Sequence, residues 1–165
     1  MTDSVALRAI YAIRQRLENI GGGAPYNTEA GQNVFISRAT VDKTLLPCVI
    51  IVPGDETAAP TSGDGVPYGA SQAMKIVFEI AVEGHIAAEQ SNSGEQLEQL
   101  KADIKRALLK YDQPQLVYPF NGNIGPIGYI GSSPLPRGDG NATESVQCRF
   151  QVVYTEKFGD PNATK

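Results

Sequence analysis

Glycine and proline are gathered into three segments of this chain, and this clustering limits where helices and strands can form. Of 17 glycines and 11 prolines, 23 fall within residues 21–31, 53–72 and 114–141 of the 165-residue sequence. Proline lacks a backbone N–H, and glycine is conformationally free, so both tend to interrupt regular structure. We therefore predict loops over these three segments, a short tail at 158–165, and one domain spanning 1–165.

Two segments outside those loops carry the apolar spacing of an amphipathic helix. Apolar side chains within 3–20 recur at intervals of four and three, with Asp3 or Ser4 as the N-cap and the glycines from Gly21 as the stop. The second helix starts with Ser93 and Gln96, whose spacing matches a capping box. Its apolar stripe consists of Leu97, Leu100, Ile104 and Leu108.

The remaining ordered segments have the character of β-strands. Residues 34–36 and 48–52 are short apolar runs, and the second has no polar alternation, which indicates a central strand. Residues 73–86 and 145–157 alternate between apolar and polar side chains, so each has one buried and one wet face. A short strand around 127–130 is predicted to pair with the last of these.

This order of elements predicts an α+β fold of two layers. We expect a mostly antiparallel or mixed sheet, with two amphipathic helices packed on its apolar face and long Gly/Pro-rich loops. The opposite face carries charged and polar side chains, and it is either solvated or a surface that contacts a partner. These residues are Lys75, Glu79, Glu83, Arg149 and Gln151.

Residues suited to catalysis are scarce. His85 is the single histidine, and its parity places it on the polar face, away from Cys148. Cys48 and Cys148 are predicted to be reduced thiols in apolar surroundings, with a disulfide as the lesser alternative. We predict no catalytic, cofactor-binding or metal-binding residues and no enzyme activity; a hydrolase or thiol enzyme built on His85 is the competing interpretation.

Charge and hydropathy restrict the partners of the chain. The formal net charge is −4, and no basic stripe typical of a nucleic-acid-binding protein is present. No run reaches the roughly 18 apolar residues of a membrane span, and the first residues do not form a secretory signal. Asp55, Glu56 and Asp64 match no calcium-binding loop, so they are predicted to be solvated.

Four stretches, taken in order, resemble the tail terminator (tail completion, minor tail protein U-like) proteins of long-tailed bacteriophages. They begin with LPCVIIVPGDE at residue 46 and VEGHI at residue 82. LKADIKRALL at residue 100 and YTEKFGDP at residue 154 complete the set. The resemblance extends over about 3–161.

The resemblance implies a homohexameric ring that caps the head-proximal end of the tail tube, ends its polymerisation and provides the surface for head–tail joining. Implied partners are the tail tube protein, the connector or stopper protein and, in a contractile tail, the sheath; DNA would only pass through the channel. The implied location is the virion tail or neck, after assembly in the host cytoplasm. A connector or stopper protein is the alternative, and a non-viral ligand-binding domain a further one. The loop residues predicted as contacts are Asp55, Glu56, Asp64, Arg137 and Asp139.

Overall fold

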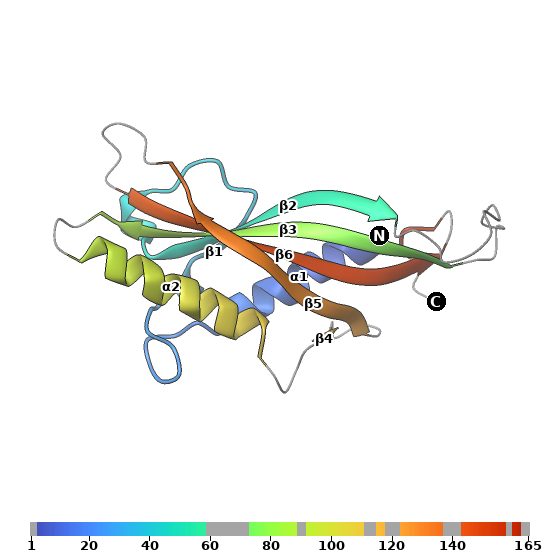
Figure 1. Cartoon of the computed structure of the whole chain (residues 1–165), viewed down its shortest axis with the longest axis horizontal. Helices are drawn as coiled ribbons and strands as arrows, with labels where there is room; N and C mark the ends of the chain where they lie inside the picture. The colour runs from blue at the N-terminus through green and yellow to red at the C-terminus, as the bar shows by residue number, and fades with distance from the viewer. Residues whose placement is uncertain are drawn as a thin grey trace.

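A computed structural model describes residues 3–58, 73–88, 92–110, 115–117, 123–136, 143–157 and 160–162 of the chain. Its helices and strands are shown in Figure 1. In chain order they are α1 (Val5–Leu17), η1 (Ala30–Gln32), β1 (Val34–Ile36), η2 (Lys43–Leu45), β2 (Cys48–Ala58), β3 (Ala73–Ala87), α2 (Ser93–Leu108), β4 (Gln115–Val117), β5 (Asn123–Pro134) and β6 (Thr143–Lys157).

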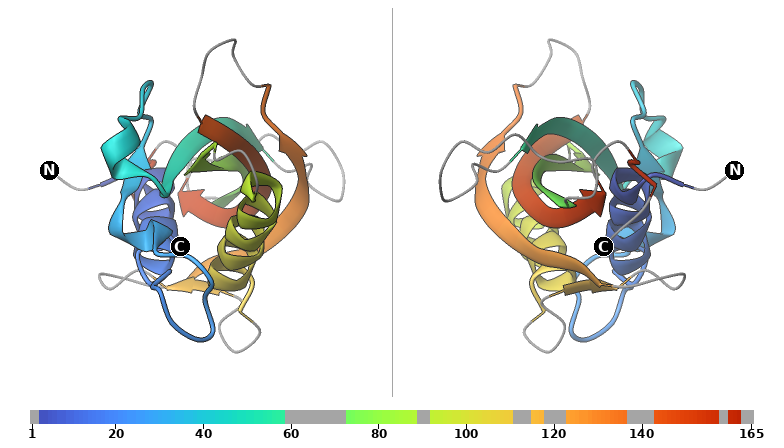
Figure 2. Two further views of the ribbon diagram at one scale, coloured as in Figure 1. Left: turned by 90° about the vertical axis from the view of Figure 1, so that its left-hand side faces the viewer. Right: turned by 90° about the vertical axis from the view of Figure 1, so that its right-hand side faces the viewer.

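The strands form one mixed sheet in the order β1-β2-β3-β6-β5-β4. β1 runs parallel to β2, and every other neighbouring pair is antiparallel. Viewed end-on in Figure 2, the sheet arches over α1 and α2, which both lie beneath the same face. The predicted α+β architecture is therefore confirmed. We call the helix-covered face the inner face and the opposite one the outer face.

The inner face and the two helices share one hydrophobic core. Alternate residues of β3 and β6 point into it, as the sequence pattern predicts, and both helical stripes are buried there. Gly84 brings α2 close to β3, because a Cβ at this position would lie 2.8 Å from Leu100 Cδ2 and 3.0 Å from Ile104 Cδ1. The most deeply buried large side chains include Phe150, Ile13, Leu17, Ile80, Leu100, Ile104 and Leu108.

Two of the predicted loops contain strand. β2 continues through 53–58, and β4 and β5 occupy 115–117 and 123–134, so the prediction of loops over 53–72 and 114–141 is wrong for those residues apart from 127–130. The predicted strand at 127–130 and its pairing with β6 are confirmed. Pro53 is tolerated because the β2–β3 register shifts between Pro53 and Glu56, at a bulge. Gly125 permits a close approach of β5 to β6, since a Cβ there would lie 2.2 Å from the Val153 carbonyl oxygen.

Of the three helix ends predicted from the sequence, one is confirmed by the structure. Ser4 caps α1 by accepting a hydrogen bond from the Leu7 N–H at 3.2 Å. The helix then ends at Leu17 with Glu18 as its C-cap, before Gly21 is reached. The N-cap of α2 is Asn92 without a side-chain cap, so the predicted capping box is wrong; Ser93 is already the first helical residue.

Candidate functional site

Four of the predicted contact residues lie together on the outer face. Lys75 and Glu79 of β3 and Arg149 and Gln151 of β6 are all exposed. Glu79 is directly opposite Gln151, and Arg149 is the next outer-face residue along β6. None of the four has an ion-pair partner within the part of the chain that the structure describes. We call this set the outer strip; it is a mixed-charge surface whose polar groups are free to bind a neighbour.

Glu83 differs from the outer strip, although it shares the same face. Its side chain is only 21% exposed. Gln147 Nε2 donates a hydrogen bond to Glu83 Oε1 at 3.2 Å, and Glu83 Oε2 lies 3.4 Å from His85 Nε2. Glu83 is therefore held within its own sheet, which makes it a poorer contact residue than Glu79.

His85 forms a polar chain across β3 and β6. It is directly opposite Ser145, and the Ser145 hydroxyl lies 2.7 Å from His85 Nδ1. Burial lowers the pKa of His85, while the neighbouring Glu83 acts in the opposite direction. The imidazole is consequently neutral near pH 7, so Nδ1 accepts the serine hydrogen bond when the proton is on Nε2. Sequence parity placed His85 on the correct face, but its partner Ser145 became evident only from the strand register.

This polar chain borders a cavity of about 360 Å³ on the outer face. Ile50, His85 and Ser145 line it from the sheet, and Arg38 and Leu135 line it from two flanking segments. A hydroxyl, an imidazole and a carboxylate that contact one another in a row are the catalytic groups of a serine hydrolase. Here Glu83 Oε2 lies 3.4 Å from His85 Nε2, a longer contact than the hydrogen bond by which a carboxylate orients the imidazole in such a mechanism.

Both cysteines are buried free thiols on opposite faces of the sheet. Cys48 is opposite His85 on the outer side, whereas Cys148 is opposite Val82 on the inner side. A disulfide between them is therefore excluded in this fold. Burial raises the pKa of each thiol to about 11, so both stay protonated at neutral pH. A thiolate nucleophile paired with His85 has no support in this geometry.

The acidic residues predicted for the first long loop lie at one end of the sheet. Asp55 and Glu56 are exposed residues of β2, not of a loop. Glu56 is opposite Phe78 and therefore belongs to the inner side, close to Tyr154 and Glu156 at the end of β6. Burial raises the pKa of Glu156, and the charge of Glu56 raises it further. The other predicted loop contacts, Asp64, Arg137 and Asp139, lie outside the described residues.

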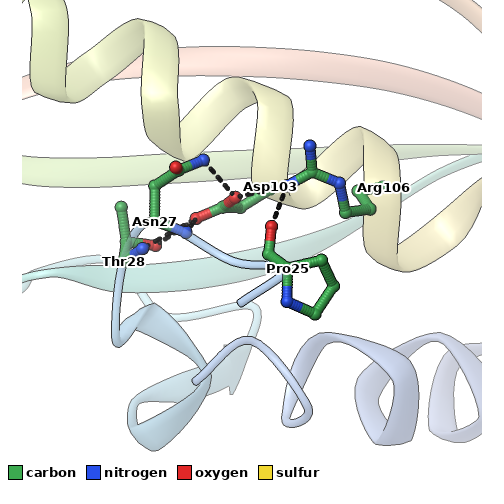
Figure 3. Close-up of polar contacts among 5 residues, drawn as sticks. All are labelled: Pro25, Asn27, Thr28, Asp103 and Arg106. Atoms are coloured by element: carbon green, nitrogen blue, oxygen red, sulfur yellow. Dashed lines mark hydrogen bonds and ion pairs between the residues drawn. The ribbon is translucent and has the colours of Figure 1, made fainter. Parts of the chain in front are cut away.

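A buried carboxylate on α2 was missed by the sequence analysis. Asp103 is fully buried, and its oxygens accept hydrogen bonds from residues 27 and 28 of the first loop (Figure 3). Oδ2 accepts the Asn27 N–H at 2.9 Å, the Thr28 N–H at 2.8 Å and the Thr28 hydroxyl at 3.0 Å, and Oδ1 accepts Asn27 Nδ2 at 2.9 Å. Arg106 reinforces this contact by donating to the Pro25 carbonyl. Asp103 thus pins the glycine-rich segment to α2, a structural role.

Among the described residues there is no group of three or more histidine, cysteine or acidic side chains able to hold a metal ion. None of the described helices combines the length and apolar character needed to cross a membrane.

Comparisons with known proteins identify the fold. No protein-family model matches the chain, and no curated protein matches it significantly. One solved structure with a similar fold is a chain of the "Virion of native gene transfer agent (GTA) particle". The two chains are 15% identical and superpose with a TM-score of 0.54 over 91% of this chain and 93% of the other. At this level of identity, the likeness is one of fold.

Proposed function

We propose that this chain is a structural virion protein, a tail terminator that forms a ring at the head-proximal end of a phage tail tube. The observation that carries the proposal is the fold likeness to a virion chain over nearly the full length of both chains. The four stretches that resemble tail terminators point to the same class. The ring would end tube polymerisation and offer its other side to the head–tail connector.

The surface chemistry supports an assembly role without catalysis. The outer strip presents exposed charges of both signs, which suit specific contacts with neighbouring proteins. The two thiols are kept protonated by burial, and the carboxylate beside the single histidine lies 3.4 Å from its Nε2. A net charge of −4 also suits a channel through which DNA passes without binding, because a strongly basic lumen would hold its phosphates.

The partners of this role are further copies of the chain, the tail tube protein, the connector or stopper protein and, in a contractile tail, the sheath. The site of action would be the tail or neck of the virion, reached after assembly in the host cytoplasm.

Tube growth in the presence of the purified chain tests this role. Tail tube protein is polymerised with and without it, and tube lengths are measured by negative-stain electron microscopy. A terminator shortens the tubes in proportion to its concentration and appears as a ring at one end only. Unchanged tube lengths together with binding to the portal-side adaptor would identify a connector or stopper protein instead. Binding to neither partner would reject both virion roles.

A further inference from the structure

The sheet has an open edge along β5. β4 pairs with β5 only as far as Pro126, and no other strand of the described residues pairs with 127–134 on the side away from β6. Unpaired edges offer backbone N–H and C=O groups to another chain. This edge also carries the exposed large apolar side chains of the described part, Tyr129 at 36% and Ile130 at 41% exposure.

A basic side chain stands beside this edge. Lys105 Nζ of α2 lies 4.7 Å from the centroid of the Tyr129 ring. Lys105 has no ion-pair partner among the residues that the structure describes. The β5 edge, defined as residues 127–134 with Lys105, thus combines apolar surface, open backbone groups and an available positive charge.

The opposite side of the sheet has a second open edge with the complementary charge. β1 pairs with β2 only at Val49–Ile51, so residues 52–58 are unpaired on that side within the described part. The exposed acidic residues Asp55 and Glu56 lie in this segment, which we call the β2 edge. Pro53 cannot donate a backbone hydrogen bond, and the adjacent bulge distorts the strand, so another strand can pair only with the residues of β2 beyond them. This restriction reduces unselective association at the β2 edge.

Strand directions make the two edges compatible. β2, β3, β6 and β5 alternate in direction across the sheet, so β5 runs antiparallel to β2. A second copy that continues the sheet therefore places its β2 antiparallel to β5 of the first. Glu56 is opposite the inner-face residue Phe78, and Tyr129 is opposite the inner-face residue Phe150. In a continued sheet, Glu56 and Lys105 consequently fall on the same side.

We propose that a second copy of this chain docks its β2 edge on the β5 edge of the first, with Glu56 of one copy paired with Lys105 of the next. This inference rests on the proposed ring. A contact between two different surfaces is head-to-tail, and head-to-tail contacts generate rings when the rotation closes. Pairing of two β5 edges would instead bring two Lys105 side chains together, which like-charge repulsion disfavours.

The acidic end of the molecule supplies a second reason for a cationic partner. Burial raises the pKa of Glu156, and the charge of the neighbouring Glu56 raises it further. Burial and the charges of Glu56 and Glu156 also raise the pKa of Tyr154, which lies beside them. An incoming ammonium group offsets the repulsion between the two carboxylates.

A charge exchange tests the docking contact. The full chain is studied by native mass spectrometry over a concentration series, with circular dichroism to verify folding. Glu56→Lys and Lys105→Glu should each weaken ring formation at least about tenfold, and the double variant should restore it, as expected of a close charge pair between proteins. Glu95→Lys is the matched control, because it makes the same charge change at an exposed position on α2 that belongs to neither edge nor the outer strip; its ring should persist.

Ile130→Asp is an independent probe, because an exposed edge residue can be changed without disturbing the core. It should abolish the ring while the monomer stays folded. Rings that survive all three single substitutions at the two edges would overturn the inference and leave the tail-terminator role standing. Glu79→Lys is made as a separate probe of the outer strip; loss of the ring in this variant, with rings intact in all the edge variants, would place the contact on the outer strip and would also overturn the inference. A wild-type chain that forms no ring, even with tube protein, would reject both proposals.

Discussion

Replacing Asp103 by asparagine tests whether a single buried carboxylate holds the first loop against α2. The substitution preserves the size of the side chain but removes its charge and one acceptor oxygen. Three of the four hydrogen bonds from residues 27 and 28 end on Oδ2, and the fourth ends on Oδ1. An amide places its oxygen at only one of these positions, and its NH₂ group then faces a donor at the other.

The expected cost follows from the strength of these bonds. Hydrogen bonds to a charged acceptor contribute about 1.5–3 kcal/mol each, whereas neutral ones contribute about 1 kcal/mol. If the loss of charge weakened all four hydrogen bonds independently, the total cost would be several kcal/mol. Part of this cost is offset because an asparagine, unlike an aspartate, does not require a charge to be buried. We expect Asp103→Asn to lower the free energy of unfolding by about 2–3 kcal/mol and Asp103→Ala by about 3–5 kcal/mol.

Urea denaturation followed by circular dichroism measures this change, with the slope of the transition confirming that the unfolding remains cooperative. Amide hydrogen exchange at Asn27 and Thr28 should quicken in both variants. Glu98→Gln is the control; Glu98 is exposed and pairs with Lys101 on the same helix, so its loss should change stability by less than about 0.5 kcal/mol. An Asp103→Asn variant within that margin of the wild type, with exchange unchanged, would refute the reasoning.

Three further substitutions or measurements probe the sheet and its buried groups. Gly84→Val should destabilise the fold by about 1–3 kcal/mol through overpacking against α2, and Leu100→Ala in the same chain should recover part of that loss, as read from urea melts. The pKa of His85 is below its ordinary value in the folded chain, so the unfolded chain binds more protons. The contribution of neutral His85 to the free energy of unfolding is therefore fully present above about pH 6.5 and is lost as the pH falls below that value. The difference in unfolding free energy between wild type and His85→Asn should therefore shrink on acidification, and a constant difference from pH 7 to 5 would contradict this. Cys48 and Cys148 should resist a thiol reagent at pH 8 in the native chain and react fully in urea, whereas rapid labelling without denaturant would show that burial does not protect them.

Most of the outer strip was predictable because strand periodicity is local. Alternation in 73–86 and 145–157 identified the buried side chains of β3 and β6 and placed Lys75, Glu79 and Arg149 on the outer face. The same parity could not reveal that Glu83 is half-buried. Its exposure depends on Gln147 of a neighbouring strand and on the segments that cover this end of the face.

Glycine and proline misled the prediction where strands tolerate them for tertiary reasons. Pro53 lies on an open edge next to a bulge, and Gly125 allows β5 to approach the Val153 carbonyl of β6. From the sequence alone, each residue indicates a break, because the neighbouring strand that explains it is distant in the chain. Loop prediction was therefore wrong for 53–58 and for the parts of 123–134 that flank the predicted strand at 127–130.

The sequence by itself determined the α+β class, the two amphipathic helices and the faces of the long strands, since these depend on side-chain periodicity along a short stretch of chain. Only the tertiary structure decided which residues meet. It paired His85 with Ser145, separated the two cysteines onto opposite faces and buried Asp103 beneath residues 27 and 28. It also left parts of β2 and β5 without a further strand partner among the described residues. Such contacts depend on strand order, register and packing between segments far apart in the chain, and periodicity within one segment carries no information about them.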